Sequence, residues 1–243
     1  MKGFDCRRTV AILALILLAG SACAADRLAP PRLGSPQYPY NEHTPAYEEM
    51  IRAQRAYEAG QLGAAFTHYR NAARWADKFG QFNVGVMYLR GEHVEFDALR
   101  GWAWVELAAE RGYPGMRQTA DAVWDLFNER ERRAARGILE DELLPVYGDE
   151  VAIERTARKM DRDLRDATGS RTGSRAFTGF MTIIERGGRT RRGDEFYDPA
   201  KWDFRRIVAY ETDLMLNWTA GNVELGELEL IDEDESPGDD AGR

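Results

Sequence analysis

A pattern of small and aromatic residues that recurs after 36 positions is the feature that most restricts the fold of this chain. The paired positions are Ala65 and Gly101, Phe66 and Trp102, Tyr69 and Val105, Ala72 and Ala108, and Ala73 and Ala109. Small residues recur at the same offsets because closely packed helices leave no room there for larger ones. An interval in the middle thirties, with one helical hairpin per unit, is typical of an α-solenoid.

Each unit has the periodicity of two amphipathic helices. In the segment 62–76 the apolar residues follow one another at steps of three, one, three, three, one and three, which forms a single stripe on one helix face. The helix before it ends at Gly60, a natural helix stop. The pattern predicts a hairpin over 47–77 and a third pair of helices, about 114–127 and 129–146, that caps the stack.

The segment 80–112 carries a more distinctive pattern. Its residues are Val84, Gly85, Val86, Met87, Tyr88, Gly91, Val94, Asp97, Trp104, Ala108, Ala109 and Gly112. In identity and spacing they resemble the Sel-one-like repeat, a relative of the tetratricopeptide repeat. The resemblance implies an all-α fold with a short, tetratricopeptide-like stack of helical hairpins over 47–147. Two residues depart from the family pattern: His93 replaces the second turn glycine, and Gly101 replaces the usual alanine, which suggests an even closer helix contact.

Eight of these positions have structural roles that follow from their own chemistry. They are Gly85, Tyr88, Gly91, Asp97, Trp104, Ala108, Ala109 and Gly112. Gly85 lets a partner helix approach, and Gly91 permits a positive φ in the turn. Asp97 lies where a helix N-cap is needed, and such a cap contributes about 0.5–2 kcal/mol. None of these roles implies catalysis.

An additional basic helix is predicted over 148–167, with Asp149 as its cap. Its apolar residues Ile153, Ala157, Met160 and Leu164 form a narrow seam. The opposite face carries five cations, which we treat as candidate contacts to an anionic surface. These are Arg155, Arg158, Lys159, Arg162 and Arg165.

Beyond this helix the pattern predicts a small mixed C-terminal subdomain. Residues 168–196 are expected to be a flexible linker that includes an apolar, β-leaning run from Phe177 to Ile184. Residues 197–231 predict a helix that begins at Asp198 and Pro199, then a short bulged strand. The acidic tail 232–243 is expected to be disordered.

The N-terminal residues 1–24 have the order of a secretory signal peptide: Lys2, Arg7 and Arg8, then the apolar run 10–19, then small residues. That run is shorter than the roughly 20 residues of a membrane-spanning helix. Cleavage after Ala24 would release a chain that starts with an extended linker, 25–46. Alternatively, Cys23 lies in a permissive lipobox and becomes a lipidated first residue. Both routes predict export, to the periplasm or to an outer-membrane lipoprotein.

The charge distribution is uneven, although the whole chain has a net charge of -8. The stretch 155–192 has eleven Arg or Lys and four acids, a net charge of +7, whereas 224–243 has nine acids and one Arg. A basic stretch followed by an acidic end is unusual. Binding to nucleic acid is not expected of an exported chain that is acidic overall.

The sequence favours neither catalysis nor a cofactor. His43, His68 and His93 have no second ligand at metal spacing, so no metal site is predicted. There is no nucleophile elbow, phosphate loop or dinucleotide fingerprint. We therefore expect a non-enzymatic adaptor that binds another envelope protein through the solenoid groove. Two alternatives stay open: binding of lipid or lipopolysaccharide through the stretch 155–192, and a hydrolase built on the C-terminal subdomain.

Overall fold

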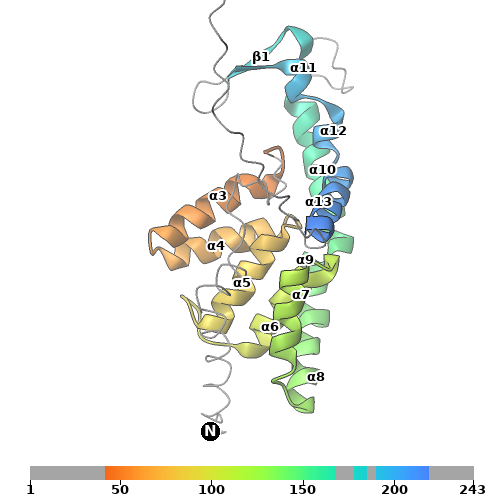
Figure 1. Cartoon of the computed structure of the whole chain (residues 1–243). Coiled ribbons are helices and arrows are strands. Elements are labelled where there is room, and N and C mark those ends of the chain that lie inside the picture. The colour runs from red at the N-terminus through yellow and green to blue at the C-terminus, as the bar shows by residue number, and fades with distance from the viewer. Residues whose placement is uncertain (1–41, 168–177, 185–189, 219–243) are drawn as a thin grey trace, which may run out of the picture.

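The computed structural model describes residues 42–167, 178–184 and 190–218 (Figure 1). This part of the chain is mostly helical, with one small two-stranded sheet, and the predicted predominance of helix is confirmed. The predicted signal peptide with Cys23, most of the linker 25–46, the strand near 223–230 and the tail 232–243 lie outside the described residues.

Two helical hairpins form the N-terminal part. Helix α3 (Pro45–Glu58) packs on α4 (Leu62–Ala73), and α5 (Lys78–Arg90) packs on α6 (Ala98–Ala108). Gly60 has a φ of 72° in the first turn, which confirms the predicted helix stop. The predicted stripe on α4 faces the core, because its buried residues are Ala65, Phe66, Tyr69, Ala72 and Ala73.

A third group of helices packs against α6. Its elements are η1 (Ala109–Arg111), α7 (Pro114–Trp124), α8 (Glu129–Gly137), η2 (Ile138–Leu143) and α9 (Leu144–Tyr147). Helix α8 begins with a capping box between Asn128 and Glu131. The predicted helix 129–146 is interrupted, because η2 is a π-helical stretch, which shifts the face that the following residues present.

Helix α10 (Asp149–Ala167) is the longest helix among the described residues. It runs beside α13 (Phe204–Trp218) and also contacts α9, α12 and α3 (Figure 1). The predicted seam faces inward, since Ala157 and Met160 are buried and Ile153 and Leu164 pack against the same core. We use the name hairpin stack for residues 42–147 and the name C-terminal unit for the described residues from Asp149 onward.

The far end of the C-terminal unit is a β-hairpin with short helices around it. Its elements are η3 (Thr178–Phe180), β1 (Thr182–Ile184), β2 (Thr190–Arg192), α11 (Gly193–Phe196) and α12 (Pro199–Trp202). The strands are antiparallel, with Ile183 opposite Arg191. One continuous helix from Asp198 was predicted, and this was wrong. Asp203 is extended and accepts a hydrogen bond from the backbone N–H of Arg205 at 3.1 Å, so a new helix starts there.

The described residues bury two apolar clusters. One lies inside the hairpin stack, and the other joins α10 to α12, α13 and Tyr197. The predicted N-terminal linker ends earlier than expected: α3 begins at Pro45, and His43 is already buried. None of the described helices has the length and apolar character needed to cross a bilayer.

Candidate functional site

Two glycines meet where α5 crosses α6. A Cβ at Gly85 would lie 2.7 Å from Cγ2 of Val105 and 2.9 Å from the carbonyl oxygen of Gly101. A Cβ at Gly101 would lie 2.7 Å from the side chain of Leu89 and 3.2 Å from the carbonyl oxygen of Gly85. Both glycines are therefore required for the close approach of the two backbones.

The turn between these helices depends on Gly91 and Asp97. Gly91 ends α5 with a φ of 66°, and His93 has the same positive φ although it is not a glycine. The Asp97 carboxylate accepts a hydrogen bond from the backbone N–H of Arg100 at 2.9 Å, so Asp97 caps α6. Tyr88 packs edge-on against Phe66 of the preceding hairpin, with ring centroids 5.6 Å apart.

The remaining repeat positions lie at the end of the second hairpin. Trp104 is buried and packs edge-on against Tyr147, while Ala108 and Ala109 are buried in the same core. Gly112 ends η1 with a φ of 74°. All eight of the positions predicted to be structural thus lie in helix contacts or turns.

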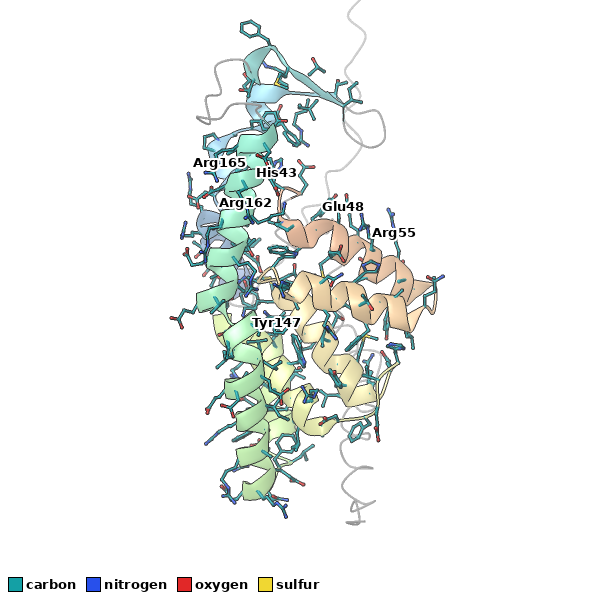
Figure 2. All side chains as sticks on the ribbon, turned by 180° about the vertical axis from the view of Figure 1, so that it is seen from behind. His43, Glu48, Arg55, Tyr147, Arg162 and Arg165 are labelled. Carbon is teal, nitrogen blue, oxygen red and sulfur yellow. The ribbon has the colours of Figure 1, made fainter. Side chains whose placement is uncertain are left out.

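The five cations predicted to form one basic face on α10 fall into two groups: some are bonded within the protein and the others are exposed. Arg155 does not face an anionic surface, because its guanidinium donates to the carbonyl oxygens of Arg74 and Val146, each at 2.7 Å. Lys159 pairs with Asp163 one turn along the helix. Arg158, Arg162 and Arg165 are exposed, and Figure 2 shows the last two near the end of α10 that lies by His43.

Helix α10 is also less basic than its face suggested. It holds five cations but six acids, because Asp149, Glu150, Glu154, Asp161, Asp163 and Asp166 are interleaved with them. Most of the positive charge of the stretch 155–192, +5 of +7, therefore comes from residues beyond α10. These findings weaken the prediction of an anion-binding helix face and leave the exposed arginines as its remaining support.

A buried network of charges joins the hairpin stack to the C-terminal unit. At its centre is Lys78, the first residue of α5, whose side chain is 0% exposed. Its Nζ lies 2.6 Å from Glu110 and 3.0 Å from Asp149, and it donates to the carbonyl oxygen of Leu107 at 3.0 Å. Gln81 accepts a further hydrogen bond from this ammonium at 3.2 Å.

Arg111 extends this network to α13. Its guanidinium donates two hydrogen bonds to Asp149, at 2.8 and 3.0 Å, and one to the carbonyl oxygen of Ala76 at 2.9 Å. It also lies 3.4 Å from Glu211, whose carboxylate accepts a hydrogen bond from the Tyr113 hydroxyl at 2.9 Å. Ala76 has a φ of 63°, so Arg111 holds a backbone conformation that alanine rarely adopts.

The network shifts the protonation of its members. Burial lowers the pKa of Lys78, although Asp149 and Glu110 oppose this. Burial alone would raise the pKa of Asp149, but the hydrogen bonds and charge of Arg111 lower it below its ordinary value. Burial raises the pKa of Glu211 to about 7, against the attraction of Arg111. Glu211 therefore changes charge near neutral pH.

Sequence reasoning did not find this network. Asp149 was predicted to be a helix cap, and this was wrong: it is the first residue of α10, and its carboxylate binds Lys78 and Arg111. Lys78, Arg111 and Glu211 are 33 and 100 residues apart along the chain, so no local spacing links them. The one available signal was Lys78 itself, a cation at the first position of a helix in which most of the following residues are apolar.

The three histidines lie in three separate environments. His43 packs between Phe196 and Trp202, with each ring centroid 4.7 Å away, and burial lowers its pKa to about 4. His68 shares a hydrogen bond with Glu49 at 2.8 Å, and His93 lies in the α5–α6 turn. Within the described ranges, no three His, Cys, Asp or Glu side chains group so that they could hold a metal ion.

Exposed apolar side chains are concentrated in one region. The large ones are Val151, Phe180, Met181, Ile184, Tyr210 and Leu216. All six belong to the C-terminal unit, and none of the large apolar side chains in residues 42–147 is exposed. Comparison of the chain with protein-family models, curated proteins and solved structures found no match.

Proposed function

We propose that this chain is an exported, non-catalytic scaffold of the Sel-one-like repeat type that binds another protein of the cell envelope. The glycine crossing of α5 and α6, the Asp97 cap and the positive φ of Gly91 support the repeat assignment, because each matches the role expected of that position. The hairpin pairs α3–α4 and α5–α6 would then be successive units of a short solenoid.

The observation that carries the binding proposal is the exposure of Tyr210 and Leu216 on α13. Tyr210 is 66% exposed and Leu216 is 42% exposed. Exposed aromatic and aliphatic side chains on one helix are typical of protein–protein contact surfaces. Because the hairpin stack offers no comparable residue, we assign the partner contact to α13 instead of the predicted solenoid groove.

The buried charge network fits this role because it fixes α13 in place. Glu211, the neighbour of Tyr210, is held by Arg111 and Tyr113 of the hairpin stack. A helix held at Glu211 presents its outer face in one orientation, which lowers the entropic cost of binding.

The alternative of a hydrolase gains little from this network. Glu211 has a pKa suited to proton transfer at neutral pH, as a general acid or base requires. However, the same carboxylate already accepts from Tyr113 and pairs with Arg111, and Lys78 and Asp149 bind each other. These mutual bonds favour a structural joint over a reacting centre.

The test is affinity capture of the tagged chain after in-cell crosslinking. Tyr210→Ser with Leu216→Ser should remove the dominant protein partner, since both side chains are exposed, and thermal unfolding of the variant checks that its fold is intact. The matched control is Glu58→Ser with Arg70→Ser, two exposed residues of the hairpin stack. The proposal fails if the control pair abolishes capture and the α13 pair does not, because the groove would then be the contact.

A further inference from the structure

The buried charge network holds more carboxylates than cations. Its two cations, Lys78 and Arg111, contact three carboxylates, those of Glu110, Asp149 and Glu211. If all three carboxylates were ionised, one negative charge would be left without a cation, and an uncompensated buried charge is costly. The network is therefore better balanced when one carboxylate carries a proton.

The geometry identifies Glu211 as the carboxylate that takes this proton. Arg111 gives Asp149 two hydrogen bonds, at 2.8 and 3.0 Å, but reaches Glu211 only at 3.4 Å. The Arg111 contact and the hydrogen bond from Tyr113 both use the Oε1 atom of Glu211. Neither bond uses Oε2, so the proton of the neutral form belongs on that oxygen.

The groups that face Glu211 from the neighbouring elements favour its neutral form. They are Asp77 before α5, Arg111 in η1, Tyr113 before α7 and Asp149 in α10. Burial raises the pKa of Glu211 to about 7, and the charges of Asp77 and Asp149 add to this rise, against Arg111 and the Tyr113 hydroxyl. Burial also raises the pKa of Tyr113, so its hydroxyl stays a donor while Glu211 titrates.

The two halves of α13 are attached to different regions of the protein. The N-terminal half packs on the core of the C-terminal unit through Ile207 and Val208. The C-terminal half meets the hairpin stack, where Glu211 enters the charge network and Met215 packs against the apolar cluster of the stack. Leu216, one of the two proposed partner contacts, belongs to this second half. Its orientation therefore depends on the attachment at Glu211.

We infer that Glu211 is a proton-dependent latch: its neutral form holds the C-terminal half of α13 on the hairpin stack, and loss of the proton releases that half. Release takes Leu216 out of its fixed orientation and so raises the entropic cost of binding a partner. The effect on the partner rests on the proposed function, whereas the latch itself rests only on the contacts of Glu211.

The direction of the pH effect follows from the two states of the carboxylate. Released into solvent, Glu211 has its ordinary pKa of 4.5, and in the docked helix its pKa is about 7. Docking therefore takes up a proton between these two values. The docking equilibrium is strongest below pH 4.5 and falls by up to about tenfold for each pH unit until pH 7, above which it changes little.

Hydrogen–deuterium exchange of the full processed chain at pH 5.5 and 7.5 tests the latch. After correction for the intrinsic effect of pH on exchange, protection of the amides of residues 211–217 should be about tenfold or more lower at pH 7.5. Protection of residues 207–209, which belong to the other half of α13, should not fall. Unchanged protection of 211–217 in the wild-type chain, or an equal fall in both halves, would overturn the inference.

Glu211→Gln supplies a side chain of the same shape that stays neutral, so protection of 211–217 should no longer fall with pH. The matched control is Asp213→Asn, which removes an exposed carboxylate from the same helix and should keep the wild-type fall. A wild-type fall in Glu211→Gln, or its loss in Asp213→Asn, would count against Glu211 as the titrating group. Exchange needs no partner, so it tests the latch separately from the partner contact, which is tested by capture with the Tyr210 and Leu216 variants.

Discussion

The hairpin stack and the C-terminal unit differ in how completely they bury their large apolar side chains. The stack closes its helices on one another with glycines at the crossing and caps in the turns, and leaves no large apolar side chain of residues 42–147 exposed. The C-terminal unit has a smaller apolar cluster and leaves six large apolar side chains in solvent. In the function that we propose, the stack is the support and the C-terminal unit provides the surface for a partner.

The largest expected effect comes from removing a member of the buried charge network that joins the two regions. Arg111→Met removes both hydrogen bonds to Asp149 and takes the cation away from Glu211, while Lys78 still pairs with Asp149. Removing one partner of a buried ion pair costs about 3–5 kcal/mol, so we expect a loss of this size in the free energy of unfolding. Urea denaturation measures it.

The control for this substitution is Arg158→Met on the exposed face of α10. Arg158 donates to the carbonyl oxygen of Glu154 in its own helix, and its replacement should change stability by about 0.5 kcal/mol or less. If Arg111→Met were as mild as the control, the charge network would not be what joins the two regions.

The second prediction uses pH to separate two contributions to stability, that of Glu211 in the buried charge network and that of His43 in the core of the C-terminal unit. Glu211 has its pKa raised from 4.5 to about 7, so its contribution to stability is full below pH 4.5 and is lost as the pH rises to 7. His43 has its pKa lowered from 6.5 to about 4, so its contribution is full above pH 6.5 and is lost as the pH falls to 4. Each contribution amounts to about 3 kcal/mol, and the two oppose each other in the same window.

A variant that lacks one of these two titrating groups should show the pH dependence of stability that the other group contributes. Glu211→Gln should give a protein whose free energy of unfolding rises between pH 4 and 6.5, while His43→Phe should give one whose stability falls between pH 4.5 and 7. Urea titrations at pH 4.5, 5.5 and 7 distinguish these profiles. Parallel curves for the two variants and the wild type would show that neither group titrates as described.

The third prediction compares one glycine from each region. Gly85→Ala places a Cβ 2.7 Å from Val105 and against the backbone of Gly101, and overpacking of this kind costs about 1–3 kcal/mol. Gly179→Ala has nothing within 4 Å of the new Cβ, so its cost should be about 0.5 kcal/mol or less. Thermal unfolding of both variants tests the contrast, and equal costs would mean that the α5–α6 crossing can relax.

The smallest expected effect concerns the arginines of α10. Arg155→Ala leaves the carbonyl oxygens of Arg74 and Val146 without their donor and should cost about 1–2 kcal/mol, since both bonds are charge-assisted but partly solvated. Arg162→Ala, at an exposed position, should cost about 0.5 kcal/mol or less. If Arg162→Ala lowered the free energy of unfolding more than Arg155→Ala, Arg155 would not be bound within the protein as described.

The sequence allowed the helices to be predicted where the periodicity is local. The stripe on α4, the stop at Gly60 and the seam on α10 follow from residues within one or two turns of each other. The charge network was missed because Lys78, Arg111 and Glu211 meet only after the hairpin stack and α13 have packed together. The break at Asp203 was missed because one aspartate competed with a helical pattern that continued on both sides of it.

The inward role of Arg155 was missed for a similar reason. A face of five cations on one helix predicts solvent exposure, and nothing within α10 shows that the carbonyl oxygens of Arg74 and Val146 lie beside it. The exposed face of the β-hairpin was not predicted either, although the apolar run that forms it was recognised as β-leaning.

The most direct test of the division between support and contact surface is site-specific photocrosslinking in living cells. A photoreactive residue is placed at Tyr210 on α13 and, in a separate chain, at Arg70 on the hairpin stack. We predict that position 210 crosslinks to one dominant envelope protein and that position 70 gives no protein adduct. A dominant protein adduct from position 70, with none from position 210, would contradict the account and return the contact to the groove of the stack.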